Sequence, residues 1–330
     1  NNNLHIAWHD KRLGNTQIFY KKIGPFLDDR NGDAANSSAI TVVGDKHVSV
    51  NSRVELNSRD EHPSIAIDNL GNAHIAWERA GDSSIGYAKL ANDGAFIVPD
   101  IRITNKFRSL WRPSTSVEAD SNGNAHIVWN DDSQTCDDEA YYTMLNGSGS
   151  VLINITRLTA DDCRNSKRQR LVVDAEDNVH VISQDRGGIN TEIFYSKINP
   201  YLDDRNGDSA NESVITIINE TPITANDGIK TNHPEVAIRN DIIHVAYYDE
   251  ATGSDQIHLS ILDKNGNIIV NDLAVTDDAS VTTSTVFTLP SIDADADGKG
   301  YITWTDSRSG NFAIYRAAYI FLKQKSIAIV

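Results

Sequence analysis

A short two-strand unit recurs along this chain of 330 residues, and it restricts the possible folds more than any other feature. The most complete copy has the apolar run Ser64–Ile67, an Asp-Asn-Leu-Gly-Asn turn and the run Ala73–Trp77. Asp and Asn side chains bond back to the backbone in such turns, and Gly accepts a positive φ. Because the flanking residues are the β-branched and aromatic types that strands favour, the unit predicts a β-hairpin.

The second strand of this hairpin marks six repeats. Its copies are His5–Trp8, His74–Trp77, His126–Trp129, His180–Ser183, His244–Tyr247 and Tyr301–Trp304. A third strand is expected after each copy, at Gln17–Tyr20, Ser84–Tyr87, Glu139–Tyr142, Glu192–Tyr195, Gln256–His258 and Ala313–Tyr315. A fourth strand is expected in most units, at Val54–Leu56, Ile101–Thr104, Ile155–Leu158, Pro222–Thr224 and Leu273–Thr276.

Four antiparallel strands per unit, six units and polar turns predict an all-β fold, a six-bladed β-propeller with four-stranded antiparallel blades. A stacked solenoid is the alternative, but its units are shorter and usually carry parallel strands. No helical periodicity of useful length competes. We expect one domain over residues 1–330, with blades at 1–57 plus 325–330, 58–105, 106–160, 161–225, 226–277 and 278–324.

The two ends of the chain bear on how such a propeller closes. The first unit lacks an innermost strand, and the terminal segment Ser326–Ile329 repeats the Ser-Ile-Ala-Ile of Ser64–Ile67. We therefore expect the C-terminal strand to complete blade one and close the ring. The alternative is that it forms the outer strand of blade six.

A second level of repetition relates the two halves of the chain. The segment 22–33 returns almost unchanged at 197–208, which places matching insertions in blades one and four. His62-Pro63 and His233-Pro234 match in the same way in blades two and five. The pattern is that of a duplicated half of three blades.

The repeated insertions are rich in oxygen ligands. Carboxylates and amides at alternate positions around a Gly are typical of loops that wrap Ca²⁺, although the sixth and twelfth positions here, Ala34 and Ile40, are not the EF-hand Gly and Glu. The alternative is a surface loop whose Asp and Asn side chains make turns. Asp293, Asp295 and Asp297 with Gly298 also resemble a Ca²⁺ loop, but Asp295 aligns with Asp68, which indicates the ordinary hairpin turn in an acidic version, with metal binding as the alternative. The expected Ca²⁺ ligands are Asp28, Asp29, Asn31 and Asp33, and Asp203, Asp204, Asn206 and Asp208.

Most recurrent polar residues are interpreted as structural. A His that recurs in five of six units is expected to be half-buried and bonded to a neighbouring turn, because a catalyst is rarely needed five times. The pattern Trp-x-Asp-x-Arg-x-Gly, seen at Trp8 and Trp304, predicts an Asp–Arg pair that holds each hairpin. A ring of Arg side chains that grips a carboxylate or sulfate is the alternative.

Residues that lead into the innermost strands are more distinctive. Loops into strand one and loops between strands two and three share one face of a propeller, so these side chains should surround the mouth of the central channel. A basic and aromatic mouth on a protein of net charge −16 suits an acidic sugar or carboxylate. The alternative is that they cap strand ends. The candidate ligand-binding residues are His62, Arg112, Arg168 and His233 with Trp111, Arg12, Arg186 and Arg308.

Charge and composition exclude some functions. The net charge of −16 disfavours nucleic-acid partners, and no apolar run is long enough for membrane insertion. The two cysteines, Cys136 and Cys163, fall on the same face of blade three, which predicts a disulfide and export. Sequons indicate a secreted, glycosylated chain, and we expect it to be a mature or trimmed fragment. The candidate glycosylation sites are Asn36, Asn146, Asn154, Asn211 and Asn219.

Over almost its whole length, the repeat resembles a known type. Pro-Ser-Ile-Ala-Ile-Asp-x-x-Gly-Asn-x-His-Ile-Ala-Trp, followed by Trp-x-Asp-x-Arg-x-Gly and Ile-Phe-Tyr, is similar to repeats of secreted bacterial and archaeal β-propeller proteins loosely related to sialidase-type repeats. The resemblance implies the fold and an extracellular or cell-surface location. It implies no catalytic residues, because the sialidase arginine triad and Tyr/Glu pair find no match here.

No other catalytic motif stands out: there is no Gly-x-Ser-x-Gly, His-Glu-x-x-His, Cys-x-x-Cys or phosphate loop. The sequence therefore favours a non-catalytic surface module that binds a glycan or an extracellular protein and is stabilised by Ca²⁺. One alternative is a polysaccharide-active enzyme, a lyase with a His/Arg site at the channel mouth. The other is a structural subunit of an extracellular assembly.

Overall fold

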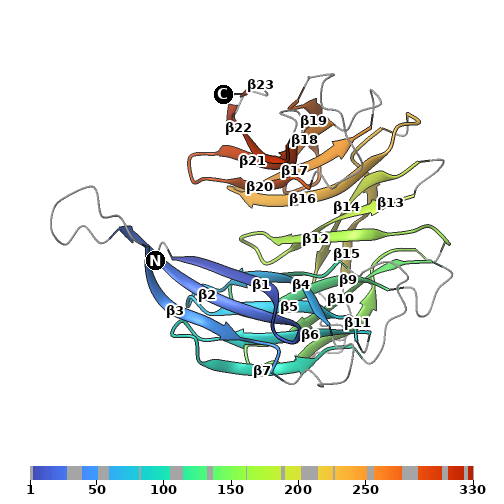
Figure 1. Cartoon of the computed structure of the whole chain (residues 1–330). Coiled ribbons are helices and arrows are strands. Elements are labelled where there is room, and N and C mark those ends of the chain that lie inside the picture. Colours follow the sequence, from blue (N-terminus) through green and yellow to red (C-terminus); the bar gives the residue numbers. More distant parts are fainter. Residues whose placement is uncertain are drawn as a thin grey trace. The chain divides into compact units, whose positions relative to one another are not determined.

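The structure is a computed structural model that describes residues 3–27, 39–50, 59–81, 83–104, 114–131, 137–160, 162–186, 190–201, 215–225, 227–250, 256–276, 289–306, 311–322 and 326–329. All regular structure in these ranges is β-strand (Figure 1). Within them, no helix is long and apolar enough to cross a membrane. The fold is that of a six-bladed β-propeller, as the repeat predicts.

The N-terminal half of the chain forms three antiparallel sheets. The first is β1 (Leu4–Leu13), β2 (Asn15–Leu27) and β3 (Ala39–His47). The second is β4 (Asp60–Ile67), β5 (Ala73–Arg79), β6 (Ser84–Leu90) and β7 (Phe96–Arg102). The third is β8 (Ser116–Ala119), β9 (Ala125–Asp131), β10 (Glu139–Leu145) and β11 (Val151–Arg157).

The C-terminal half forms three more sheets of the same kind. The fourth is β12 (Lys167–Val173), β13 (Val179–Asp185), β14 (Glu192–Asn199) and β15 (Ile215–Pro222). The fifth is β16 (Thr231–Arg239), β17 (Ile242–Asp249), β18 (Gln256–Asp263) and β19 (Ile268–Ala274). The sixth is β20 (Ser291–Ala294), β21 (Lys299–Asp306), β22 (Ala313–Leu322) and β23 (Ser326–Ile329).

The chain divides into two compact units. Unit 1 comprises Asn1–Gln134 and Tyr142–Ile155, and unit 2 comprises Thr135–Tyr141 and Thr156–Val330. The assignment of 1–330 to a single domain stays a prediction.

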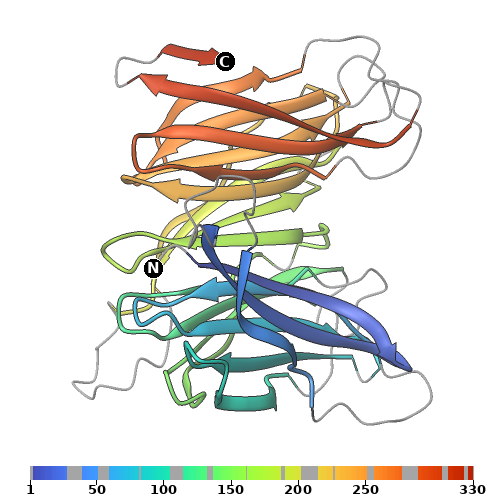
Figure 2. The ribbon, with the colours of Figure 1, turned by 60° about the vertical axis from the view of Figure 1, so that its left-hand side comes forward.

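The C-terminal strand belongs to blade six. β23 pairs antiparallel with β22, with Ser326 opposite Leu322 and Ile329 opposite Tyr319 (Figure 2). The expectation that 325–330 completes blade one is therefore wrong, and the alternative is confirmed. Few residues separate β22 from β23 in sequence, so their pairing closes a far shorter loop than a return to the N-terminus would. The first sheet is three-stranded in the described residues.

The predicted third strands are all present, and the fourth strands of blades two to five overlap the predicted segments but begin earlier. β7, β11, β15 and β19 begin four to seven residues before the predicted segments. In blade one the outer strand is β3, whereas 54–56 lies outside the described residues. The fourth strands are largely exposed, so they lack a clear apolar alternation. Two of the predicted fourth-strand segments end in a Thr whose hydroxyl bonds to the third strand. Thr104 accepts the backbone N–H of Ile85, and Thr276 accepts that of Ile257.

Between neighbouring blades of one unit, apolar strand faces pack into continuous cores. Ile18 and Tyr20 of blade one pack with Ile75 and Trp77 of blade two. Ile182 and Tyr195 of blade four pack in the same way with blade five, through Val245 and Tyr247 among others. The innermost strands are thereby held on a rigid support.

The recurrent His is a structural residue, as predicted, but it is fully buried. His74 Nδ1 lies 2.8 Å from the Tyr87 hydroxyl and its Nε2 lies 3.3 Å from Asp68 of the hairpin turn. Burial lowers the pKa of His74 to about 4, so the ring is neutral at neutral pH. The same arrangement recurs at Asp120, His126 and Tyr142, and at Asp174, His180 and Tyr195.

The acidic hairpin at the start of blade six is also an ordinary turn. Asp295 Oδ1 accepts the backbone N–H groups of Asp297 and Lys299, and Gly298 has a φ of 82°. Asp68 accepts N–H groups from Leu70 and Asn72 in the same pattern. The prediction that Asp293 and Asp295 belong to the repeat hairpin is confirmed.

Candidate functional site

Three of the candidate residues share one unusual backbone conformation. His62, Arg168 and His233 have φ angles of 51°, 55° and 53°. Each lies within a β-bulge of an innermost strand, where the register with the second strand shifts in β4, β12 and β16. A non-glycine residue with positive φ carries strain, and bulges re-aim side chains, often near functional sites. The residues that break the sequence repeat therefore break the strand geometry as well.

In unit 2, His233 packs on an aromatic ring. Its imidazole stacks on Tyr248 with ring centroids 5.0 Å apart and an interplanar angle of 25°. Both ring nitrogens are buried and have no hydrogen-bond partner. Burial lowers the pKa of His233 to about 3, and the charges of Arg168 and Arg170 act in the same direction. His233 is therefore a neutral imidazole at neutral pH.

Two arginines from β12 lie beside this imidazole. Arg170 binds Glu235 of β16 with its Nη2 2.7 Å from Oε1, so its charge is compensated within the fold. Arg168 is partly buried and makes no ion pair with a described residue. Burial lowers the pKa of Arg168 from its ordinary value, because its charge is held away from water. Arg168 is thus a cation for which a bound anion would be a favourable partner.

A basic pocket of about 240 Å³ adjoins these residues in unit 2. Three cationic side chains and four polar ones line it: Lys167, Arg186 and Lys230, with Asn165, Gln184, Asn190 and Thr191. Gln184 connects the pocket to the imidazole, because its Oε1 accepts the backbone N–H of His233 at 3.1 Å. Gln184 is therefore shared by the pocket and the surroundings of the His233 backbone.

The cations of the pocket differ in their acidic neighbours. Lys167 Nζ lies 3.2 Å from Asp138, and Lys230 Nζ lies 3.7 Å from Glu250 with more than half of the Lys230 side chain exposed. Arg186 is exposed and makes no ion pair with a described residue. The pocket is therefore a positive region on a protein whose net charge is −16.

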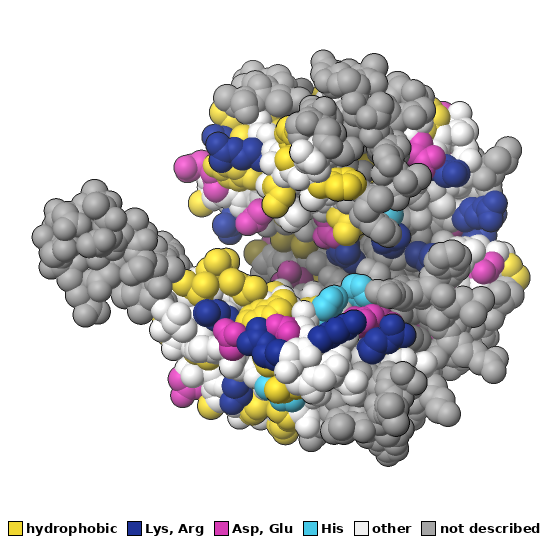
Figure 3. Space-filling model, viewed as in Figure 1, with side chains coloured by type: hydrophobic (Ala, Val, Ile, Leu, Met, Phe, Trp, Pro, Cys, Tyr) yellow, Lys and Arg dark blue, Asp and Glu magenta, His cyan; other side chains and the backbone are white. Residues whose placement is uncertain are grey.

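In unit 1, the matching His62 has acidic neighbours. Its Nδ1 lies 3.0 Å from Oε2 of Glu78, and Glu61 is the preceding residue on β4. The His9 ring meets the His62 ring edge-on at 5.8 Å. Figure 3 shows histidine side chains close to acidic and basic ones on the face over β1, β4 and β5.

Arg12 has the structural role that its repeat motif predicts. Its Nη2 lies 2.6 Å from Asp10 and its Nη1 lies 2.6 Å from Asp45. The guanidinium also covers the Phe19 ring at 4.6 Å. The Asp–Arg pair of the first hairpin is therefore confirmed, and Arg12 belongs to neither the pocket nor the His62 cluster.

Many predicted site residues lie outside the described residues: Trp111, Arg112 and Arg308, all eight proposed Ca²⁺ ligands, Cys136, and the sequon residues Asn36 and Asn211. Cys163 has a positive φ of 60°, and because Cys136 lies outside the described residues the disulfide stays a prediction. Asn146 begins a turn in which its side-chain oxygen accepts the N–H groups of Ser148 and Ser150. Asn154 lies on β11 and Asn219 on β15, and glycosylation at these sequons stays a prediction.

Sequence reasoning missed several residues of both sites. Glu78 and Tyr248 come directly after the repeated second-strand segments His74–Trp77 and His244–Tyr247, which we call the signature. In the strand register they lie opposite Glu61 and Asn232. Lys167 and Lys230 line the pocket but belong to no repeated motif. The available signal was the residue after each signature, which changes from blade to blade: His9, Glu78, Asn130, Gln184, Tyr248 and Thr305.

Comparison with known proteins gives a fold and no family. No family model matches the sequence, and no curated protein sequence matches it. A protein of unknown function from Dyadobacter fermentans has a similar structure, with a TM-score of 0.59 at 8% identity over 96% of this chain and 90% of that one. The GH93 α-L-arabinofuranosidase of Fusarium graminearum, solved with arabinobiose, has a TM-score of 0.52 at 9% identity over 81% and 83% of the two chains. At these identities the likeness shows the fold alone.

Proposed function

We propose that this propeller binds an anionic glycan, one that carries uronic acid or sulfate groups, through the basic pocket of unit 2. The observation that carries the proposal is the convergence of Lys167, Arg186 and Lys230 on a single pocket in a chain of net charge −16. Concave sites that combine a few charged and polar groups are the usual form of small-ligand sites. A chance distribution of lysine and arginine side chains over the surface would rarely place three of them around one cavity.

The lining groups suit both the charge and the hydroxyl groups of such a ligand. Arg186 offers a planar pair of donors to a carboxylate or sulfate, and the two lysines add point charges. The amides of Asn165, Gln184 and Asn190 can each donate to and accept from sugar hydroxyls. The GH93 α-L-arabinofuranosidase of similar fold was solved with arabinobiose, and this supports a sugar as the ligand.

Calorimetric titration with uronate oligosaccharides tests the proposal, with neutral oligosaccharides of equal length as the comparison. We expect affinity for the anionic series only, and a loss of about tenfold or more in Arg186→Ala, because a charge-assisted hydrogen bond is worth roughly 1.5–3 kcal/mol. Lys264→Ala is the matched control, since Lys264 is a cation of unit 2 that pairs with Glu176 and Asp241 and does not line the pocket. Equal affinity of wild type and Arg186→Ala would disprove this site.

A lyase is the second candidate, and the His233 region favours it. β-Elimination from a uronate needs a base that removes the proton next to the carboxylate and a cation that stabilises the resulting charge. His233 is neutral and stacks on Tyr248, and the nearby Arg168 makes no ion pair with a described residue. An increase in ultraviolet absorbance from unsaturated product would support this activity. Its loss in His233→Gln with glycan binding retained would place the base; a broad uronate screen with no product would exclude it.

We include in this proposal an extracellular or cell-surface location and the binding of Ca²⁺. An extracellular or cell-surface setting is supported by the sequons and by the resemblance to secreted propeller repeats. Ca²⁺ binding by the insertions 28–33 and 203–208 is tested by thermal melting with and without a chelator. A melting temperature that does not change on chelation would remove Ca²⁺ from the proposal.

A further inference from the structure

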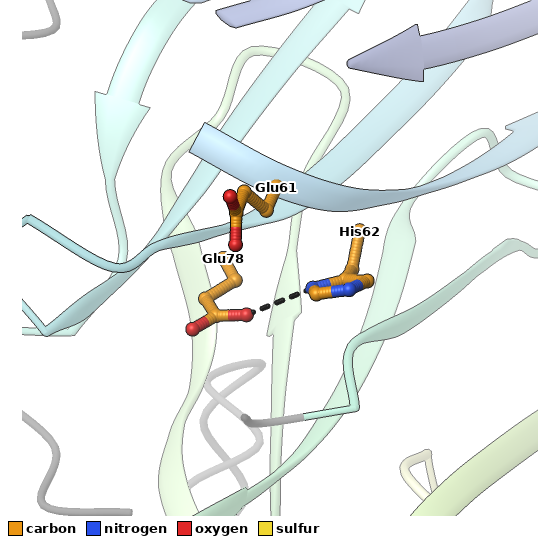
Figure 4. Close-up of side chains that lie close together, drawn as sticks. All are labelled: Glu61, His62 and Glu78. Atoms are coloured by element: carbon orange, nitrogen blue, oxygen red, sulfur yellow. Dashed lines mark hydrogen bonds and ion pairs between the residues drawn. The ribbon is translucent and has the colours of Figure 1, made fainter. Parts of the chain in front are cut away.

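We propose that Glu61, His62 and Glu78 of blade two bind one divalent transition-metal ion, Zn²⁺ or Mn²⁺. One ligand atom from each side chain lies within 4.8 Å of the other two. Figure 4 shows Glu61 and His62 on β4 with Glu78 on the neighbouring β5, and a hydrogen bond that joins His62 to Glu78. The cluster lies in unit 1 and is independent of the glycan pocket of unit 2.

The donor set selects the class of ion. An imidazole nitrogen with two carboxylate oxygens is a mixed N/O set of the kind that Zn²⁺ and Mn²⁺ accept, whereas Ca²⁺ prefers oxygen ligands alone. Atoms bound to one such ion at about 2.0–2.2 Å are at most about 4.4 Å apart. The three donors are therefore already close to ligand spacing, and small side-chain rotations would complete it.

The burial of the carboxylates is a second argument for a cation. Glu78 is 3% exposed and Glu61 is 8% exposed, so two acidic groups are held close together with little access to water. The one hydrogen-bond partner of the Glu78 side chain among the described residues is His62. A buried carboxylate is costly unless a positive charge or several donors compensate it. A divalent ion bound to Glu78 would supply that charge.

The position of His62 suits a metal ligand. The β-bulge, in which His62 has a φ of 51°, sets the orientation of the His62 side chain. The backbone N–H of His62 donates to His9 Nδ1 at 3.3 Å. About 40% of the His62 side chain is exposed, whereas that of Glu78 is 4% exposed, so solvent reaches the cluster from the histidine side. An ion can therefore enter the site without opening the blade.

The duplicated half of the chain provides an internal comparison. At the matching positions blade five has Asn232, His233 and Tyr248, so it keeps the histidine and its bulge but neither carboxylate. The fold and the repeat therefore do not require the two glutamates. A metal function confined to blade two accounts for acidic residues at both positions.

Another His/Asp cluster serves as a control and is not itself proposed. Asp249, His258 and Asp272 also lie within 4.8 Å of one another in blade five. Asp272 Oδ1, however, accepts a hydrogen bond from Tyr247 at 2.9 Å and lies 2.6 Å from His258 Nδ1. This carboxylate is already satisfied by the fold.

The test is calorimetric titration of untagged, chelator-treated protein with ZnCl₂, MnCl₂ and CaCl₂. We expect one Zn²⁺ or Mn²⁺ per chain at this site, a loss of about tenfold or more in affinity in His62→Ala and Glu78→Gln, and no change in Asp272→Asn. The visible spectrum of bound Co²⁺ gives a second readout, and its imidazole-dependent bands should disappear in His62→Ala. If Glu78→Gln does not fold, Glu61→Gln replaces it.

Two outcomes would overturn the proposal. One is wild-type protein that takes up neither Zn²⁺ nor Mn²⁺. The other is uptake that persists in His62→Ala and Glu78→Gln, or that is lost in Asp272→Asn instead. A site that binds Ca²⁺ as tightly as Zn²⁺ would contradict the assigned donor chemistry.

Discussion

Blades two and five present the same dipeptide, His62-Pro63 and His233-Pro234, in the same bulge and with φ angles that differ by only a few degrees. Their surroundings are nevertheless opposite. His62 lies beside Glu61 and Glu78, whereas His233 lies against Tyr248 near two arginines. The β-bulge with a positive φ at the histidine is common to both blades, and the chemical difference between the two sites comes from the surrounding side chains.

The difference arises at positions that the repeat leaves free. The residue after the second-strand signature is Glu78 in blade two and Tyr248 in blade five, and strand pairing brings each next to the residue before the histidine. The preceding blade contributes His9 in one case and Gln184 in the other, each of which accepts the histidine N–H. A few residue differences at equivalent positions therefore suffice to make one site acidic and the other basic.

The largest expected effect comes from removing the aromatic partner in blade five. Tyr248→Ala should lower the free energy of unfolding by roughly 2–4 kcal/mol, because it deletes a partly buried ring and its stack on His233. Glu78→Ala, at the matching position in blade two, should change it by less than about 1 kcal/mol when a chelator is present, because the lost hydrogen bond is offset by reduced repulsion from Glu61. Urea denaturation of both variants measures the contrast. Equal losses would mean that the two positions share a purely structural role.

The second effect is a pH dependence specific to blade five. The pKa of His233 is about 3 in the folded protein and near 6.5 in the unfolded chain, so the unfolded state binds the proton first as the pH falls. The stability that neutral His233 contributes is therefore complete above pH 6.5 and is lost from there down towards pH 3. His233→Gln should flatten the stability profile in that window, by a slope of up to about 1.4 kcal/mol per pH unit. Denaturation at pH 8 and pH 5 checks this, and parallel profiles for the two proteins would contradict it.

Much of the fold was predictable because its determinants are local and buried. The hairpins, third strands and recurrent His74, His126 and His180 follow from turn residues and apolar runs that repeat. The starts of the outer strands were predicted too late because these strands are half-exposed and lack a strong pattern. Ser326–Ile329 was assigned to blade one because it copies an innermost strand, but the same four residues also suit the outer edge, where a short connection to β22 decides the pairing.

The candidate sites were predictable only in part. His62, Arg168 and His233 could be found because they interrupt a repeat at equivalent positions. Glu78, Tyr248 and the pocket lysines could not be found in this way, because only strand register and the packing of two blades bring them to the histidines or to Arg186. The spacing of residues along the sequence does not indicate which residues meet through strand pairing or through the packing of two blades.

An exchange of residues sharpens the comparison further. The double variant Asn232→Glu, Tyr248→Glu places the blade-two carboxylates around His233. It should acquire a Zn²⁺ site, but one about tenfold weaker than that of blade two, because the charges of Arg168 and Arg170 repel the ion. Zinc titration with His62→Ala as the background measures the new site alone. Affinity equal to that of the native blade-two site would show that the arginines have no influence there.

The smallest expected effect concerns Arg12, which occupies the loop after the first signature, as Arg186 occupies the loop after the fourth. Arg12 is committed to Asp10 and Asp45 at the surface, with 43% of its side chain exposed, whereas Arg186 lines the pocket. Exposed ion pairs contribute little, so Arg12→Ala should lower the unfolding free energy only slightly, and this loss should shrink further in high salt. Glycan affinity should stay unchanged in Arg12→Ala and fall in Arg186→Ala. A parallel loss of binding in both variants would instead support the ring of arginines as a single anion site, and it would show that repeat position, rather than the local pocket, determines function.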